Sequence, residues 1–260
     1  MFRSLHIAAT GMMAQEALLD AISNNLANSG TVGYKRVRAD FQDLVYQNIR
    51  AAGTPTSQTT NSPTGYQLGS GVRVVSTSRS FGQGALQMTN NPLDLAIEGS
   101  GFFVVQQPDG LPAYTRSGTF RTDAQGRIVT AEGMPLDPPI SIPAEATSVT
   151  VGSDGTVSAM MPGQTTPTQI GQLQVAIFVN PAGLQSLGHN LMTNTASSGD
   201  PQVGAPAAEG RGALLQGALE QSNVEVAEEM IALIAAQRAY EVNTKVIAAA
   251  DGMLQAATRR

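Results

Sequence analysis

Apolar residues that recur every seven positions near both ends of the chain limit its fold more than any other feature. Near the N-terminus the members of this repeat are Leu5, Met12, Leu19 and Leu26, followed three residues later by Ala8, Gln15 and Ile22. A seven-residue apolar repeat places one stripe of a helix against a partner helix. The sequence therefore predicts a helix over residues 3–28 that packs along a single seam.

A longer repeat closes the chain. Its members are Val226, Leu233, Tyr240, Ile247 and Leu254, with Met230, Gln237, Thr244 and Asp251 in the second seam position. Ser222 followed by Glu225 is typical of a capping box, which marks where a helix begins. The predicted helix has about 35 residues and is roughly 50 Å long at the usual rise per residue.

A second apolar stripe lies beside the seam of this C-terminal helix. Its members are Ile231, Ile234, Val246, Ala249 and Met253. A helix that is apolar on two adjacent sides needs more than one neighbour. The N-terminal helix can cover one side, and we expect other subunits to cover the second. In the alternative, the whole stripe packs on the middle of the same chain.

Between the helices, short β-strand patterns alternate with turn residues. Leu95–Glu98 and Phe102–Val105 read as strands on either side of a glycine bend, and Asp109-Gly110 and Asp154-Gly155 read as hairpin turns. This spacing favours an antiparallel sandwich or barrel. The predicted fold is therefore α+β, with long terminal helices forming a coiled-coil-like tube domain around an antiparallel all-β middle domain.

Four regions follow from these patterns. They are an N-terminal tube helix (1–33), an extended linker (34–70), a β-rich domain (71–220) and a C-terminal tube helix (221–260). Residues 51–71 are rich in Gly, Ser, Thr, Asn, Gln and Pro. Such a segment has too few apolar residues to bury a core of its own.

Residues that could carry out chemistry are scattered. The chain has no cysteine, and neither His6 nor His189 has the Ser and Asp neighbours of a catalytic triad. The Gly-x-Gly pairs at 69–71 and 99–101 precede strands, whereas a phosphate-binding loop precedes a helix. We therefore expect no catalytic site, no metal and no cofactor.

Charge and hydropathy argue against two kinds of partner. The net charge of −5 leaves no basic field for nucleic acid. No run of about 18 apolar residues could span a membrane. The N-terminus lacks the continuous apolar core of a cleaved signal peptide. If the chain leaves the cytoplasm, we expect it to do so without a cleaved Sec-type signal.

The end of the N-terminal helix carries a recognisable motif. Its members are Asn24, Asn25, Leu26, Ala27 and Asn28, followed by Thr31, Gly33, Tyr34 and Lys35. This motif resembles the signature of the bacterial flagellar rod and hook axial family, Asn-Asn-Leu-Ala-Asn followed by Thr-x-Gly-aromatic-Lys. Further similar stretches are Gly99–Phe103, Tyr114–Phe120, Ser222–Met230, Gln237–Glu241 and Ala250–Leu254.

Within that family the chain resembles the distal-rod branch, through the stretch Asp40–Arg50 that follows the signature. The resemblance implies a rod-specific segment, about 46–63, that contacts neighbouring subunits along the axis. The contact residues implied are Tyr46, Gln47, Ile49, Arg50, Pro55 and Pro63.

The resemblance also implies a function, partners and a location. The function is a homo-oligomeric, straight, stiff, hollow drive shaft, which is also an export channel. The implied partners are the proximal rod proteins, the hook subunits, the outer P and L bushing rings and the flagellar type III export apparatus. The implied place is the periplasmic part of the flagellar basal body, reaching the outer membrane. Open alternatives are a hook or proximal-rod subunit, or a secreted β-rich cell-wall-binding protein or glycan hydrolase.

Overall fold

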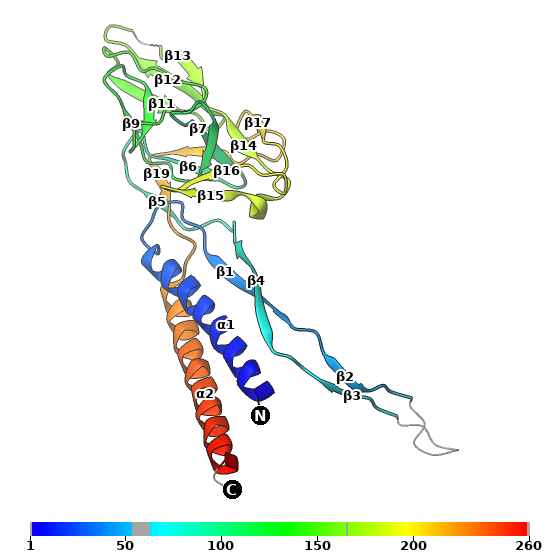
Figure 1. Cartoon of the computed structure of the whole chain (residues 1–260). Helices are drawn as coiled ribbons and strands as arrows, with labels where there is room; N and C mark the ends of the chain where they lie inside the picture. Colours follow the sequence, from blue (N-terminus) through cyan, green and yellow to red (C-terminus); the bar gives the residue numbers. More distant parts are fainter. Residues whose placement is uncertain (1, 54–62, 165, 259–260) are drawn as a thin grey trace. The chain divides into compact units, whose positions relative to one another are not determined.

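A computed structural model describes residues 2–53, 63–164 and 166–258 of the chain (Figure 1). The chain divides into two compact units. We call residues 1–27, 37–78 and 225–260 the helix–ribbon unit, and residues 28–36 and 79–224 the β unit. Among the described residues, no helix has the length and apolar character needed to cross a membrane.

Two long helices dominate the helix–ribbon unit. Helix α1 spans Phe2–Ala27 and helix α2 spans Val226–Thr258, and the two lie side by side (Figure 1). The alanine-rich sequence of α2 favours a helix, and Glu228 and Glu229 stabilise its first turn by facing the positive end of the helix dipole. Both predicted helices are thus present, close to their expected limits.

Two contacts set the register of the helix pair. The Asn25 amide donates to Glu229 Oε2 at 3.3 Å, and a Cβ added to Gly11 would lie 3.1 Å from Asn243 Nδ2. Gly11 precedes Asn25 in α1 by the same number of residues by which Asn243 follows Glu229 in α2. The helices are therefore antiparallel, and the same register brings Leu18 level with Ala236.

The buried row of α2 differs from the predicted second seam position. The predicted row of Met230, Gln237, Thr244 and Asp251 is exposed, and the row one residue earlier is covered instead: Glu229, Ala236 and Ala250 are buried and Asn243 is half-buried. Small residues such as Gly11 and Ala236 allow the two backbones to approach closely, which the larger side chains of the predicted row would prevent.

The other predicted seam residues vary in exposure. Val226 and Tyr240 are exposed in this chain. Ile22 is buried, and seven residues are half-buried: Leu5, Met12, Leu19, Leu26, Leu233, Ile247 and Leu254.

The region predicted as an extended linker is a two-stranded ribbon. Strand β1 (Val37–Asp43) pairs with β4 (Val72–Arg79), and β2 (Gln47–Arg50) pairs antiparallel with β3 (Tyr66–Leu68). Residues 34–36, also assigned to the linker, belong to the β unit. The sequence did not predict strands in this region. The strands of the ribbon are short, and each pairs with a strand that lies far along the chain. A polar segment can satisfy its backbone hydrogen bonds by pairing with itself.

The β unit is built on an antiparallel six-stranded sheet of order β15-β16-β8-β7-β14-β17. These strands are β7 (Phe102–Gln106), β8 (Pro112–Thr115), β14 (Val175–Ile177), β15 (Gln185–Gly188), β16 (Leu191–Thr193) and β17 (Gln202–Gly204). A short 3-10 helix spans Pro181–Gly183 between β14 and β15.

Smaller antiparallel sheets complete the β unit. The first has three strands: β11 (Ser148–Val151), β12 (Thr156–Met160) and β13 (Thr168–Gln172). The others are pairs: β9 (Phe120–Thr122) with β10 (Ile128–Thr130), β6 (Leu95–Glu98) with β18 (Ala213–Gln216), and β5 (Leu86–Met88) with β19 (Ala218–Glu220). The predicted α+β class with antiparallel sheets is confirmed.

Strand β7 separates two apolar clusters of the β unit. Successive side chains of a strand point to opposite faces. Phe103 packs edge-on against Phe120 at 5.0 Å between ring centroids, in a cluster with Leu95 and Ile97. On the other face, Phe102 packs with Phe178 in a cluster that includes Tyr114. The β unit thus forms two apolar cores of its own.

Candidate assembly site

Helix α2 carries several apolar side chains that the rest of the helix–ribbon unit leaves exposed. The exposed members are Val226, Met230, Ile231, Ile234, Tyr240, Val242, Val246 and Met253, which we call the outer α2 face. Ile231 is 70% exposed. Leaving a branched apolar side chain in water forgoes roughly 1.5–3 kcal/mol of burial free energy. Exposed apolar side chains in this number are typical of a surface that binds another protein.

The ribbon exposes a second apolar set. Its members are Phe41, Val45, Tyr46, Ile49, Tyr66, Val74 and Val75, which we call the ribbon face. Val45 is 87% exposed. An isolated two-stranded ribbon is only marginally stable in water, because it has no second layer to pack against. Strand β1 contacts α1, but within the described residues the side chains of the ribbon face remain exposed.

Most of the rod-specific residues inferred from the sequence lie on this ribbon. Tyr46 precedes β2, and Gln47, Ile49 and Arg50 lie within it, all exposed. Pro63 is exposed just before β3, and Pro55 lies outside the described residues.

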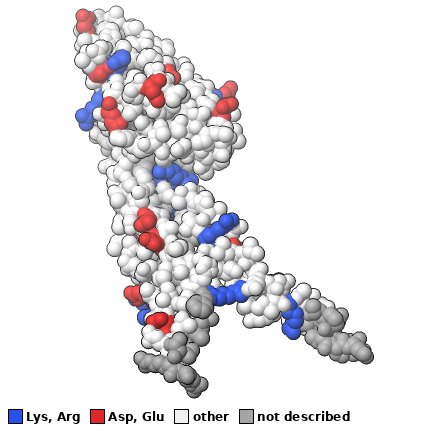
Figure 2. All heavy atoms as spheres, viewed as in Figure 1, with Lys and Arg blue, Asp and Glu red and all other residues white. Residues whose placement is uncertain are grey.

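Charged side chains are sparse in the chain, and Figure 2 shows broad uncharged areas between them on the face drawn. The exposed contacts available here are thus mainly apolar and neutral polar.

Arg3 ties the first turn of α1 to the ribbon. Its guanidinium donates to Gln47 Oε1 at 2.7 Å, to the Leu68 carbonyl at 3.0 Å and to the Gly69 carbonyl at 3.3 Å. It therefore holds β2 and β3 together at one point. This contact was missed from the sequence.

Gly71 makes a second close approach between the ribbon and α1. A Cβ there would lie 2.2 Å from Thr10 Oγ1, and the φ of +111° is one that only glycine adopts readily. Arg3 and Gly71 together fix how the ribbon leaves the helix pair.

Arg3→Ala is expected to speed hydrogen exchange of the β2 and β3 amides about fivefold, because roughly 1 kcal/mol of hydrogen bonding to the ribbon is lost. The measurement is hydrogen–deuterium exchange followed by mass spectrometry. Arg38→Ala is the matched control, since the Arg38 side chain pairs with Asp40 two residues away at the surface. Equal exchange in both variants would show that Arg3 does not hold the ribbon.

The signature residue Asn25 joins three elements of the helix–ribbon unit. Its side chain donates to the Val37 carbonyl and accepts from the Val37 N–H, each at 2.8 Å, while also contacting Glu229. Asn25 is buried, whereas Asn24 and Ala27 are exposed. The paired hydrogen bonds mimic a strand partner, so Asn25 fixes the start of β1 against both helices.

Asn28 and Thr31 form the turn that follows α1. Thr31 Oγ1 donates to Asn28 Oδ1 at 3.1 Å, and the Thr31 N–H donates to the Asn28 carbonyl at 3.1 Å. The chain then passes into Gly33, whose φ is +70°. A Cβ at Gly33 would lie 2.6 Å from the Arg116 carbonyl carbon, so this corner requires glycine.

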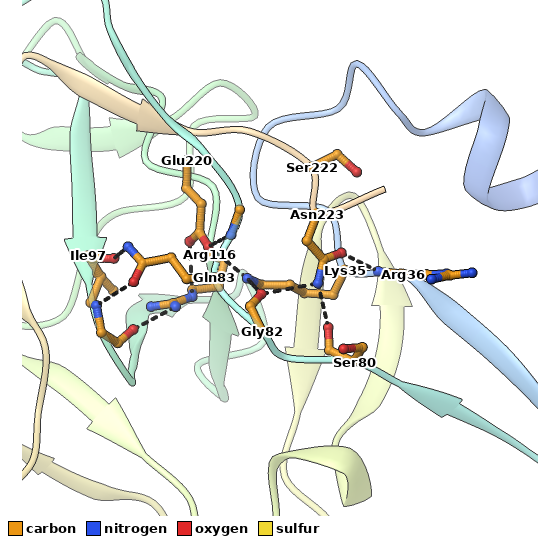
Figure 3. A network of polar contacts seen from close by, with 12 residues as sticks. Lys35, Arg36, Ser80, Gly82, Gln83, Ile97, Arg116, Glu220, Ser222 and Asn223 are labelled. Carbon is orange, nitrogen blue, oxygen red and sulfur yellow. Dashed lines mark hydrogen bonds and ion pairs between the residues drawn. The ribbon is translucent and has the colours of Figure 1, made fainter. Parts of the chain in front are cut away.

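Lys35 ends the signature inside the β unit (Figure 3). Its side chain is fully buried, and its ammonium lies 2.7 Å from Glu220 Oε1 and donates to the Gly82 carbonyl at 2.8 Å. Burial lowers the pKa of Lys35, against the opposing effect of the hydrogen bond to Glu220 and its charge. The residue therefore serves the internal structure of the β unit.

Arg116 approaches the same carboxylate from the other side (Figure 3). Its Nε lies 3.2 Å from Glu220 Oε2, and its Nη2 donates to the Gly99 carbonyl at 2.7 Å. Glu220 Oε1 also accepts from the Gly84 N–H at 2.9 Å. Burial lowers the pKa of Arg116, and the charge of Glu220 opposes this shift. We call Lys35, Arg116 and Glu220 the ion cluster.

Asn223 extends the network next to the ion cluster. Its Oδ1 accepts from the Arg36 N–H at 2.7 Å, and its Nδ2 donates to the Ser80 and Gly82 carbonyls. Four segments distant in sequence thus meet at one place. The motifs Tyr114–Phe120 and Ser222–Met230 pointed to two of these segments, but no local signal shows that Arg116 and Glu220 pair with Lys35.

The histidines stay apart from these networks. His6 is exposed on α1, and His189 Nδ1 contacts the Glu132 carboxylate at the surface of the β unit. Within the described part of the chain, no group of three His, Cys, Asp or Glu residues is placed to hold a metal ion.

Models of flagellar axial proteins match three stretches of the chain. The model "Flagella basal body rod protein" matches residues 5–35, which include the signature from Asn24 to Lys35. "Flagellar hook protein FlgE/F/G D1 domain" matches residues 96–159, and "Flagellar basal body rod FlgEFG protein C-terminal" matches residues 215–260.

Full-length similarity extends beyond these stretches. The chain is 51% identical over 255 residues to the flagellar basal-body rod protein FlgG of Buchnera aphidicola subsp. Acyrthosiphon pisum, with 98% of both chains covered. It is 48% identical over 258 residues to FlgG of Caulobacter vibrioides, with 99% of this chain and 98% of that protein covered. It is also 30% identical over 267 residues to the flagellar hook-basal body complex protein FlhP of Bacillus subtilis, with 98% and 97% covered.

Proposed function

The chain belongs to the FlgG family of flagellar basal-body rod proteins, and on that premise we propose that it is a structural subunit of the distal rod. In this role, identical subunits polymerise into a straight, stiff and hollow shaft. The shaft transmits torque from the motor to the hook, and its channel carries exported subunits. A subunit of this kind needs surfaces that are exposed in the single chain and buried in the polymer.

The observation that carries the proposal is the contrast between the two units. The outer α2 face and the ribbon face together expose fifteen large apolar side chains in the helix–ribbon unit. The β unit, in contrast, closes its cores around Phe103 and Phe102. Burying the exposed faces against copies of the same chain would supply the apolar free energy for polymerisation.

The helix residues divide into two proposed roles. The buried and half-buried members (Leu5, Met12, Leu19, Ile22, Leu26, Leu233, Ile247 and Leu254) stabilise the helix pair itself. The exposed members, Val226, Met230 and Tyr240, pack against neighbouring subunits to form the wall of the tube. Asn24, exposed at the end of α1, adds polar contacts between subunits.

The ribbon provides the proposed axial contacts. Tyr46, Gln47, Ile49, Arg50 and Pro63 are exposed on it, and we assign Pro55, which lies outside the described residues, to the same contacts. An extended ribbon that reaches a neighbouring subunit resists bending, because the contact must slide or break when the rod curves. This accounts for the stiffness proposed for a distal rod.

We propose that the wider setting follows that of the family. The shaft would meet proximal rod proteins at one end and hook subunits at the other, and it would turn inside the P and L rings. Its place would be the periplasm up to the outer membrane, reached through the flagellar type III apparatus without a cleaved signal peptide. The low charge of the surface suits rotation inside a ring, since few strong ion pairs would form and hold the shaft.

We propose a structural role and no enzymatic one. The buried charged residues Lys35, Arg116 and Glu220 bond to one another and to nearby backbone groups. A glycan hydrolase needs two carboxyl groups facing a cleft, one of them as a proton donor. Glu220 instead lies between the two cations Lys35 and Arg116.

The test is to express the chain in a flagellated bacterium whose own FlgG-family gene is deleted. We expect swimming to return, and isolated basal bodies to contain the chain in their distal rods by immunogold electron microscopy. A chain that is exported but remains soluble, with rods that stop short, would contradict the proposal.

A further inference from the structure

Methionine is the side chain of this protein that a peroxide can oxidise. The chain contains ten methionines, no cysteine and no tryptophan. Cysteine and methionine sulfur atoms are the usual targets of peroxides, and exposure decides which of them react. Since no thiol competes for the oxidant, the exposed thioethers are the sites at which it would react.

Two exposed methionines lie on the outer α2 face. Met230 and Met253 are 53% and 56% exposed, and they lie toward opposite ends of the helix. Met230 lies one turn before Ile234, and Met253 lies two turns after Val246. Residues four or seven apart share one side of a helix, so each thioether has an exposed aliphatic neighbour beside it.

Two methionines of the β unit provide a comparison. Met88 is 59% exposed on β5, whereas Met192 is 4% exposed in the cluster around Phe102. Exposure therefore predicts that a peroxide oxidises Met88, Met230 and Met253 and spares Met192. Of the three oxidised residues, Met230 and Met253 alone lie on the face to which we have assigned subunit contacts.

We propose that Met230 and Met253 form a modification site, at which oxidation by a peroxide prevents the free subunit from polymerising. The inference rests on the proposed function, because it concerns the contacts made through the outer α2 face. In the reaction, a lone pair of the thioether sulfur attacks one peroxide oxygen and forms an S–O bond. The O–O bond breaks, the other oxygen leaves with a proton as water, and the sulfur loses two electrons to the peroxide.

The product, methionine sulfoxide, changes what the outer α2 face can bury. Its S–O group is polar and accepts hydrogen bonds, and burying such a group without a donor is costly. The side chains of Ile234 and Val246 have no donor to offer. In the free subunit both sulfoxides remain in water, so the fold tolerates them. In the polymer the subunit contact covers the thioethers, so the site reacts only before assembly.

The first experiment treats the purified full chain with hydrogen peroxide, locates the sulfoxides by peptide mass spectrometry and measures the critical concentration for polymerisation. We expect sulfoxide at Met88, Met230 and Met253, an unchanged circular dichroism spectrum, and a critical concentration that rises roughly tenfold or more. Methionine sulfoxide reductases A and B, which together reduce both epimers, should restore the original value.

The outcomes of this experiment separate the inference from the proposed function. An untreated chain that polymerises supports the proposed function whatever the peroxide does. An unchanged critical concentration with both residues oxidised, or no sulfoxide at Met230 and Met253, would overturn the inference alone. An untreated chain that fails to polymerise would overturn the proposed function and the inference with it.

Leucine variants assign the effect to these two sulfur atoms. Met230→Leu with Met253→Leu keeps the apolar volume and removes both thioethers, so it should polymerise equally before and after treatment. The matched control is Met13→Leu with Met88→Leu, because these side chains are 68% and 59% exposed outside the outer α2 face. The control should lose polymerisation on treatment as the unaltered chain does. The inference fails if the Met230 and Met253 variant also loses it.

Discussion

Replacing both Ile231 and Ile234 by serine is expected to abolish rod assembly while leaving the single chain folded. The two side chains are 70% and 50% exposed, so the unfolding free energy of the chain should change by only about 0.5 kcal/mol per site. In the polymer, each buried isoleucine contributes roughly 1.5–3 kcal/mol. Losing both should weaken each subunit contact by a factor of about 10² to 10⁴.

The effect is large because the same contact repeats at every subunit of a polymer. The measurement is the critical concentration for polymerisation of the purified chain, read by sedimentation, together with swimming in the deletion strain. Leu111→Ser with Val179→Ser is the matched control, because these side chains are 61% and 82% exposed on the β unit. Assembly of the Ile231 and Ile234 variant at the unaltered concentration would rule out the outer α2 face as a subunit contact.

Glu220→Gln is expected to lower the unfolding free energy of the β unit by about 3–5 kcal/mol. The substitution keeps the shape of the side chain but leaves Lys35 and Arg116 buried without their shared counterion. The midpoint of thermal unfolding should fall by roughly 6–20 °C. Near-ultraviolet circular dichroism measures this midpoint through the signal of the buried Tyr114 in the β unit.

A further substitution, which removes one of the two cations, separates this electrostatic effect from a packing defect. The double variant Lys35→Met with Glu220→Gln removes one positive and one negative charge, so its loss should be smaller than the sum of the two single losses. Glu132→Gln is the surface control, because Glu132 and the His189 side chain that it contacts are 41% and 69% exposed, and it should change the stability little. Additive losses in the double variant would contradict the electrostatic origin.

Local patterns in the sequence predicted a large part of this fold. Seven-residue repeats identified α1 and α2 because helical hydrogen bonds join residues only four apart. The capping box predicted at Ser222 and Glu225 was misplaced, since α2 begins at Val226 and Ser222 Oγ accepts from the Val224 N–H. Glycine-containing turns such as Asp109-Gly110 and Asp154-Gly155 marked hairpins, and both glycines have the positive φ that such turns require. The signature from Asn24 to Lys35 pointed to the family, although it did not reveal what each residue contacts.

The sequence by itself therefore determined the helices, the antiparallel β class and the family, since each depends on residues that are neighbours along the chain. The tertiary structure alone decided which row of α2 faces α1, because close approach at Gly11 selects among rows that differ by one position. It alone decided that polar segments near residues 47 and 67 pair as a ribbon. It also decided that Lys35 meets Glu220 across 185 residues. Such pairings depend on the packing of distant segments, and no local periodicity encodes that packing.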